Sequence, residues 1–294
     1  MKNRSARRGL QAAAIPLFAL LASVAHADWA LNMPEGVTIL SKEIYGLHML
    51  ILWVCVAIAV VVFGVMIYSM IKFRKSQGAE ADKTLVHSTR VEVVWTVVPI
   101  LILVAIAVPI AKSLIRIEDM GSVDLNIKVT GYQWKWEYEY LGQDVSFFST
   151  LKRDSDAARQ LDSGIDPETI PHYLLDVDNP LVIPAGQKIR FLLTAQDVIH
   201  AWWVPDFGMK KDAIPGYVNE LWVQVDADKV GTYRGQCAEL CGRDHGFMPI
   251  VVEVKSPAEF DAWLRARQAE QKLAAVAPDA PAVTASAAHP AVAQ

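Results

Sequence analysis

Two long stretches without a charged residue dominate the first part of the chain. The first is almost entirely apolar over 47–71, and the second covers 93–111. As a helix, the second stretch would extend about 28 Å, close to the thickness of the hydrocarbon core of a bilayer. Pro99 and Pro109 would kink that helix, which neighbouring helices in a membrane tolerate. The pattern predicts a hairpin of two transmembrane helices within 28–115.

Basic residues are distributed unequally around these two stretches. The loop between them carries Lys72, Arg74, Lys75, Lys83 and Arg90. After the second stretch, the nearby basic residues are Lys112 and Arg116. Because basic loops remain in the cytoplasm, we expect both ends of the hairpin and the rest of the chain to face the periplasm.

Residues 1–27 have the pattern of a cleaved signal peptide. Basic residues near the start precede a short apolar stretch at 15–21, and Ala25-His26-Ala27 forms a small-x-small cleavage site. An uncleaved anchor helix is the alternative, but this apolar stretch is shorter than a bilayer span. We therefore expect the mature chain to begin at Asp28.

From about Asp124 the hydrophobic pattern changes to a period of two. Within 129–140, aromatic residues alternate with polar ones, which predicts one half-buried strand. A further strand-like run, 191–199, ends at His200. Other short strands are expected at 181–183, 188–194, 219–225, 231–236 and 249–254. Turn residues separate these strands, so the pattern indicates a sandwich or a Greek-key barrel.

The remaining segments differ in composition from the strands. Segment 153–168 is rich in acidic residues and poor in apolar ones, which predicts a solvated surface insertion. An amphipathic closing helix is expected at 257–272. The Ala/Pro/Val-rich tail, 273–294, has the composition of a disordered segment.

Composition narrows the possible classes of function. A formal net charge of -4 argues against a nucleic-acid binder. The three cysteines, Cys55, Cys237 and Cys241, are too few for a framework of several disulfides, and the chain contains no Cys-x-x-Cys-His haem-attachment motif. Cys55 lies in the middle of the first apolar stretch, where a packing role is expected.

Metal-binding side chains are concentrated in one short loop. Cys237, Cys241, His245 and Met248 lie there, and His200 can approach them from an earlier strand. Thiolate, thioether and imidazole together suit copper. One thiolate with two histidines and a methionine would describe a mononuclear blue-copper site. A second thiolate allows two sulfurs to bridge two metal ions, so that one electron is shared with little atomic rearrangement.

Two other uses of the cysteine pair are possible. Periplasmic cysteines at this spacing could form a disulfide. They could also bind structural zinc, although a Cys-x-x-x-Cys pair with one nearby histidine is a poor match to zinc-finger spacing. The accompanying His200, His245 and Met248 favour a metal site over a disulfide.

Six short motifs follow one another along the chain. They are 92–99, 132–136, 177–179, 197–202, 211–216 and the cysteine loop, 235–249. The six motifs occur in the order, and after the helical hairpin, that are typical of subunit II of bacterial cytochrome c oxidase. The chain resembles this family from about residue 40 to 265. The resemblance implies a membrane-anchored chain in the bacterial inner membrane, with a cupredoxin-like Greek-key barrel at 116–272 facing the periplasm.

The resemblance also implies a binuclear copper A centre. Cys237 and Cys241 would bridge both copper ions. One copper would be completed by His200 and Met248, and the other by His245 and the backbone carbonyl of Glu239. The Glu239 side chain would bind a magnesium ion shared with subunit I, for which a carboxylate is suited. Spacing alone equally allows a solvated loop acid at this position.

Two further single residues gain a role from the resemblance. Trp134 matches a surface indole that accepts electrons above the copper pair, whereas the alternation alone would place it in the aromatic core. Tyr132 stands where the family often has histidine. Glu92 matches a carboxylate at the start of the K proton pathway, whereas acids at a membrane edge are commonly flanking residues.

Acidic residues match the family's docking face for cytochrome c. They are Glu139, Asp178 and Asp197, and Gln196 replaces an acid often found there. Basic cytochromes would be steered to such a face by opposite charge. Each acid taken singly is equally compatible with an ordinary solvated surface.

The function implied is electron transfer from cytochrome c to the haem-copper subunit I, where oxygen is reduced. The expected partners are subunit I, other oxidase subunits, cytochrome c and membrane lipid, without nucleic acid. A periplasmic copper chaperone or thiol reductase is an alternative, but such proteins have one anchor helix and a thioredoxin-like α/β domain. A copper-free quinol oxidase subunit would lack Cys237 and Cys241.

Overall fold

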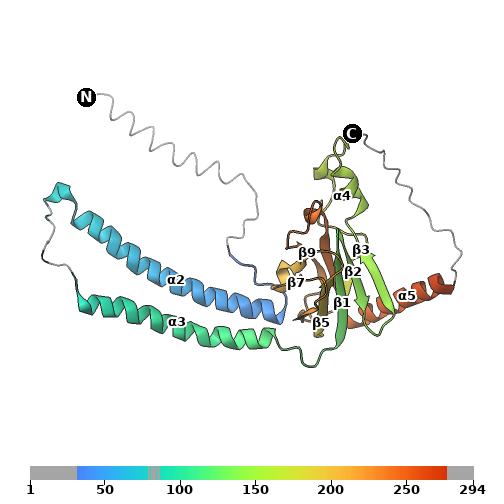
Figure 1. The fold of residues 1–294 in the computed structure, drawn as a ribbon, viewed down its shortest axis with the longest axis horizontal. Coiled ribbons are helices and arrows are strands. Elements are labelled where there is room, and N and C mark those ends of the chain that lie inside the picture. The colour runs from blue at the N-terminus through green and yellow to red at the C-terminus, as the bar shows by residue number, and fades with distance from the viewer. Residues whose placement is uncertain (1–31, 79, 81–83, 85–86, 277–294) are drawn as a thin grey trace. The chain divides into compact units, whose positions relative to one another are not determined.

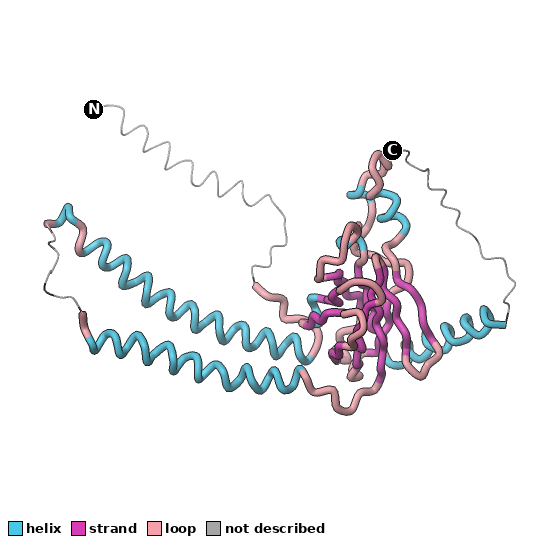
Figure 2. The backbone as a smooth tube through the Cα atoms, viewed as in Figure 1, coloured by secondary structure: helices cyan, strands magenta, loops and turns pink. Residues whose placement is uncertain are grey.

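The computed structural model describes residues 32–276 except 79, 81–83 and 85–86. The predicted signal peptide and the tail from 277 onward lie outside the described residues. The described chain contains a helical hairpin and a domain of β-strands (Figures 1 and 2).

The hairpin consists of α2 (Ile39–Lys72) and α3 (Thr89–Ile117), joined by a loop with the short helix η1 (Lys75–Gln77). Both long helices are apolar and long enough to cross a membrane, and their most apolar windows have no buried residues. A helix of a water-soluble domain would bury one face, so these surfaces suit lipid or partner helices. Ser113 Oγ donates to Glu43 Oε1 at 2.5 Å and links the two helices.

Two five-stranded sheets form the β domain. In spatial order, the first sheet contains β3 (Val145–Ser149), β2 (Lys135–Tyr140), β1 (Leu125–Tyr132), β5 (Ile189–Ala195) and β8 (Asn219–Val223). The second contains β4 (Leu181–Pro184), β10 (Pro249–Lys255), β9 (Gly231–Cys237), β6 (His200–Val204) and β7 (Met209–Ala213). Neighbouring strands are often distant in sequence, as in a Greek key. The predicted fold class, a two-helix hairpin followed by an all-β cupredoxin-like domain, is confirmed.

Four short helices and one long closing helix complete the domain among the described residues. They are α4 (Arg153–Ala158), η2 (Pro167–Thr169), η3 (Pro205–Phe207), η4 (His245–Phe247) and α5 (Pro257–Val276). The predicted closing helix corresponds to α5, which continues past the expected end at Lys272. The predicted surface insertion contains α4, in which Ser155 and Ala158 are buried.

Aromatic side chains fill the core between the sheets. Trp136, Tyr138, Tyr140, Phe191 and Trp202 are fully buried. The Tyr140 hydroxyl donates to the Val182 carbonyl at 2.7 Å and accepts from the Val182 amide at 3.0 Å. Burial raises the pKa of Tyr140, which keeps this donor protonated. Since Tyr140 lies on β2 and Val182 on β4, the two hydrogen bonds join the sheets.

The predicted single strand at 129–140 is wrong: the segment is a hairpin of β1 and β2 that turns at Gln133 and Trp134. Tyr132 pairs with Lys135 across this turn, and paired residues share a face of the sheet. The Tyr132 hydroxyl donates to Glu137 at 2.8 Å on that face. Tyr132 therefore does not belong to the buried aromatic row of β2. The alternation was misleading because the aromatic residues continue at every second position through the two-residue turn. After the turn, however, these positions lie on the opposite face of the sheet.

The predicted run 191–199 also differs from the structure. β5 ends at Ala195, and after a bend His200 begins β6 instead of ending a strand. Strands β3, β6 and β7 were not predicted. The bend moves the chain from the first sheet to the second, which places His200 next to β9.

Candidate metal centre

The candidate ligands come from the ends of two paired strands and from the loop that follows them. His200 is the first residue of β6, and Cys237 is the last residue of β9. These strands are antiparallel neighbours, with Trp202 opposite Cys237, so the pairing brings His200 close to Cys237. The remaining side chains lie in the loop between β9 and β10: Cys241, His245 and Met248.

The sulfur and nitrogen atoms of these side chains converge on one site. Cys237 Sγ lies 3.8 Å from Cys241 Sγ and 3.9 Å from His200 Nδ1. Cys241 Sγ lies 3.5 Å from both His245 Nδ1 and Met248 Sδ. His245 is half-buried, and the other four residues are no more than 4% exposed. In the described part of the chain, a group of three or more histidine, cysteine or acidic donors occurs only here.

The spacing of the two sulfurs fits a shared metal site. A disulfide places its sulfurs about 2.05 Å apart, whereas these free thiols are 3.8 Å apart. Two sulfurs bound to one ion at about 2.3 Å lie within about 4.6 Å of each other. One tetrahedral zinc would use four donors, but five side chains gather here, and the Glu239 carbonyl lies 3.4 Å from Cys237 Sγ. Thiolate, imidazole and thioether donors in this number fit two copper ions.

Asp197 orients the His200 ring. Its Oδ1 lies 2.9 Å from His200 Nε2, while the backbone amides of Gln133 and Val198 each donate to the carboxylate at 2.7 Å. Burial favours a higher pKa for Asp197, but hydrogen bonds from His200 and the two amides outweigh it and lower that pKa. The ionised carboxylate accepts a hydrogen bond from Nε2–H, so Nδ1 is the ring nitrogen that faces Cys237 and that would bind a metal there.

The two thiols differ in acidity. Burial acts to raise the pKa of Cys237, but hydrogen bonding with His200 and with backbone groups lowers it to about 7. Burial, followed by the charge of Cys237, raises the pKa of Cys241 to about 12. Cys237 therefore ionises first, and a bound cation is needed to make Cys241 a thiolate as well.

Comparison with known proteins identifies the family. Residues 125–255 match the family described as cytochrome c oxidase subunit II, periplasmic domain, and residues 26–112 match its transmembrane domain. The probable cytochrome c oxidase subunit 2 of Rickettsia bellii is 41% identical, over 81% of this chain and 84% of that protein. Cytochrome c oxidase subunit 2 of Cereibacter sphaeroides is 35% identical, over 82% of each chain.

The chain belongs to the cytochrome c oxidase subunit II family. The predicted resemblance is therefore confirmed, and α2 and α3 are its membrane anchor. A solved structure, the periplasmic domain of subunit II of Bradyrhizobium japonicum cytochrome oxidase, is 41% identical and covers 51% of this chain and 96% of that chain, with a TM-score of 0.43.

In this member of the subunit II family, Trp134 contacts the cysteine loop directly. Its indole Nε1 donates to the Cys241 carbonyl at 3.2 Å, and Gln133 Nε2 donates to the same oxygen at 2.8 Å. The indole is half-buried, and Gly242 packs against it. One edge of the ring therefore reaches a ligand residue while another part reaches the surface.

The predicted acids lie in different surroundings. Glu239 is exposed, with its carbonyl towards Cys237. Glu139 forms an ion pair with Lys128 at 3.3 Å, and Asp178 accepts the Thr150 amide at 2.7 Å. Glu92 is half-buried in the first turn of α3. None of these four side chains belongs to the cluster of ligand atoms, and their predicted roles stay predictions.

Sequence reasoning missed the residues that support His200. Asp197 was assigned to the docking face, although an acid three residues before a ligand histidine is a possible signal for the orienting role. Trp136 packs edge-on against the His200 ring, 5.8 Å between centroids, and donates to the Met248 carbonyl at 3.3 Å. Gly131 lies beneath the ring: a Cβ there would be 2.7 Å from His200 Cδ2.

We predict that Gly131→Ala displaces the His200 ring and weakens copper binding about tenfold or more, because an added methyl in a packed site costs roughly 1–3 kcal/mol. Metal analysis of the copper-loaded chain, titrated with a competing chelator, measures the change. Gly246→Ala is the matched control, since a Cβ at Gly246 meets no atom within 4 Å. Equal copper affinity of the two variants would contradict the packing argument.

Proposed function

We propose that this chain accepts electrons from cytochrome c through a binuclear copper A centre and passes them to the haem-copper subunit I, supporting oxygen reduction and proton translocation. The observation that carries the proposal is the pair of buried thiols 3.8 Å apart, each next to its own imidazole. Family membership supports a location in a bacterial inner membrane, with the copper domain in the periplasm.

The donor set divides between two metal positions. Cys237 and Cys241 would bridge both ions, with His200 and Met248 on one, and His245 with the Glu239 carbonyl on the other. When bound, the copper pair would supply one-electron chemistry in which the charge is shared between two ions. Strand pairing at His200 and Cys237 keeps the ligand atoms in place when the charge changes.

Trp134 connects this centre to the protein surface. Its hydrogen bond to the Cys241 carbonyl gives a short route of bonds from the indole ring to a bridging sulfur. The half-exposed ring is open to a docked donor, whereas the two cysteines, His200 and Met248 are no more than 4% exposed. This arrangement supports Trp134 as the first acceptor of the electron.

The surface around the centre suggests how partners bind. Glu139, Asp178 and Asp197 would attract a basic cytochrome c, although each also has an internal hydrogen-bond or ion-pair partner. The exposed Glu239 carboxylate would bind a magnesium ion together with ligands from subunit I. A hard divalent cation prefers such oxygen donors.

We predict that the full chain in detergent, with its thiols reduced before it is loaded with copper, binds about two copper ions through the two thiolates. The oxidised, mixed-valence form of the pair should be purple, with one unpaired electron shared by both ions. Metal analysis and electron paramagnetic resonance measure this. Cys241→Ser should abolish the shared signal, and Cys55→Ser, in α2, should retain it. A blue mononuclear spectrum, or a disulfide between Cys237 and Cys241 in the assembled complex, would refute the proposal.

We predict that Trp134→Phe slows electron uptake from cytochrome c by about tenfold or more, equivalent to roughly 1.4 kcal/mol in the barrier. The copper spectrum should stay unchanged, because the ligand side chains are intact. Stopped-flow reduction of the assembled oxidase measures the rate, with Trp203→Phe as the control. Rising ionic strength should slow electron uptake by the Trp134→Phe and Trp203→Phe enzymes to the same extent, because neither substitution changes the docking acids. An unaltered rate in Trp134→Phe would show that electrons take another route.

Glu92 is the candidate for proton uptake by the assembled oxidase. We predict that Glu92→Gln slows proton uptake and turnover by about tenfold or more, because an amide cannot release or accept the proton. Glu118→Gln, at the opposite end of α3, is the control. Proton uptake and turnover equal to those of the unmodified enzyme would end this hypothesis.

A further inference from the structure

The connection between β3 and β4, residues 150–180, is a folded structure beside the cysteine loop. The pattern of 153–168 predicted a solvated insertion, but Ser155 is fully buried and its hydroxyl accepts the Leu174 amide at 3.2 Å. Leu151 and Val177 form an isolated β-bridge at its base. We name residues 150–180 the crossover, since they join the two sheets.

The crossover is anchored to the strand that carries Cys237. Asp176 accepts from Arg234 on β9 at 3.4 Å and from Lys152 at 3.1 Å. The Lys152 amide donates to the Asp176 carbonyl at 3.0 Å. The base of the crossover is therefore fixed relative to β9.

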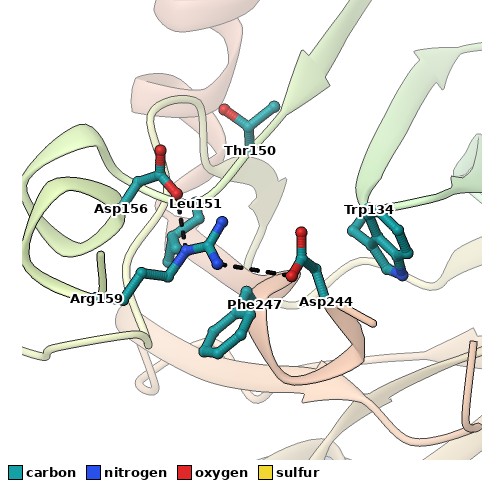
Figure 3. A pocket seen from close by; sticks show the side chains of 7 residues that line it. All are labelled: Trp134, Thr150, Leu151, Asp156, Arg159, Asp244 and Phe247. Atoms are coloured by element: carbon teal, nitrogen blue, oxygen red, sulfur yellow. Dashed lines mark hydrogen bonds and ion pairs between the residues drawn. The ribbon is translucent and has the colours of Figure 1, made fainter. Parts of the chain in front are cut away.

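Arg159 extends from the crossover to the cysteine loop. Its Nε donates to Asp156 Oδ1 at 2.8 Å, and its NH1 lies 3.6 Å from Asp244 Oδ1. The guanidinium also lies over the Phe247 ring, 4.4 Å from the centroid. Figure 3 shows Arg159 between Asp156 and Asp244, with Phe247 below it. The Arg159 side chain is 23% exposed and that of Asp244 is 15% exposed, so this ion pair is less screened than one on an open surface.

Asp244 and Phe247 enclose a metal ligand. They precede and follow His245 in the turn of η4, and Met248 comes directly after Phe247. The Phe247 amide donates to the Asp244 carbonyl at 2.9 Å. The Asp244 side chain makes no capping bond to η4 and instead faces Arg159 and Arg243. Arg159 thus contacts both sides of the turn that positions His245 and Met248.

No other polar contact joins the crossover to the cysteine loop among the described residues. A cavity of about 270 Å³, lined by Trp134, Thr150, Asp156, Arg159, Asp244 and Phe247 among others, lies between the two segments. Since Arg159 bridges this space, it replaces the packing that would otherwise support η4 on this side.

We propose that Arg159 is a positioning residue that holds η4, and with it His245 and Met248, in the arrangement needed to bind the metal. Its role towards copper rests on the proposed function. Its effect on η4 is a property of the chain itself and can be measured without metal.

The first measurement is amide hydrogen exchange of Phe247 in the metal-free full chain. In Arg159→Ala, the Phe247 amide hydrogen should exchange about tenfold faster or more than in the unmodified chain. The reason is that the turn loses both the ion pair and the stacked guanidinium. Arg159→Lys retains the charge but loses the planar stacking, so an intermediate rate is expected. Arg153→Ala, an exposed arginine of α4, is the matched control and should match the unmodified chain.

A double-mutant cycle separates a direct contact from general destabilisation. Asp244→Ala should speed the exchange by itself but add little in the Arg159→Ala background, since the pair is already broken. Additive effects, or unchanged exchange in Arg159→Ala, would overturn the proposal. If Arg159→Ala does not fold, Arg159→Lys and its cycle with Asp244→Ala decide the question in the same way.

The second measurement is copper release to a chelator from the loaded full chain. Arg159→Ala should release copper about tenfold faster and change the copper hyperfine pattern, whereas Arg153→Ala should do neither. Release and hyperfine pattern identical to those of the unmodified chain would overturn the role towards copper. If the unmodified chain binds no copper pair, the proposed function fails, while Phe247 exchange still decides whether Arg159 holds η4.

Discussion

The pairing of β6 with β9 is the constraint on which the candidate metal centre depends. It sets Trp202 opposite Cys237, and the Ala238 amide donates to the Ala201 carbonyl at 3.0 Å, just beyond the strand end. His200 and Cys237 are therefore placed by backbone hydrogen bonds, not by flexible side chains. The loop after Cys237 then needs only to return towards β10 for Cys241, His245 and Met248 to meet them. Ligands fixed in this way suit a centre whose atoms should move little when its charge changes.

The same rigidity explains the surroundings of His200. Its ring is held by the Asp197 carboxylate on one side, by the Trp136 edge on another, and by the missing side chain of Gly131 beneath it. Asp197 is itself fixed by two backbone amides. An acid that the resemblance assigns to a docking surface therefore sets which ring nitrogen faces Cys237, and its side chain remains 31% exposed.

Local patterns were sufficient to predict the helices α2 and α3 and the side chains that gather at the candidate metal site. Charge-free apolar runs define a membrane span directly, and four of the five candidate ligand side chains lie within the short segment 237–248. The turn at Gln133 and Trp134 was missed because neither residue is a typical turn former and the aromatic alternation continues through it. The contact between Arg159 and Asp244 could not be predicted, because it joins charged residues far apart in sequence. In the sequence alone, such residues look like ordinary solvated charges.

For the proposed function, the cysteine loop has to exclude water from the metal ligands and still exchange electrons with a partner. The exposures along the loop are compatible with both conditions. Cys237, Cys241 and Met248 point inward and are almost completely buried, whereas Leu240, next to Cys241, is 77% exposed. The Cys241 carbonyl accepts a hydrogen bond from the half-exposed indole of Trp134, which would link the surface to the centre without an open channel. Arg159 supports the far end of this loop, where a cavity would otherwise leave η4 free to move. The buried cysteines, the indole at the Cys241 carbonyl and the turn of η4 beside Arg159 thus all depend on one loop placed at the end of β9.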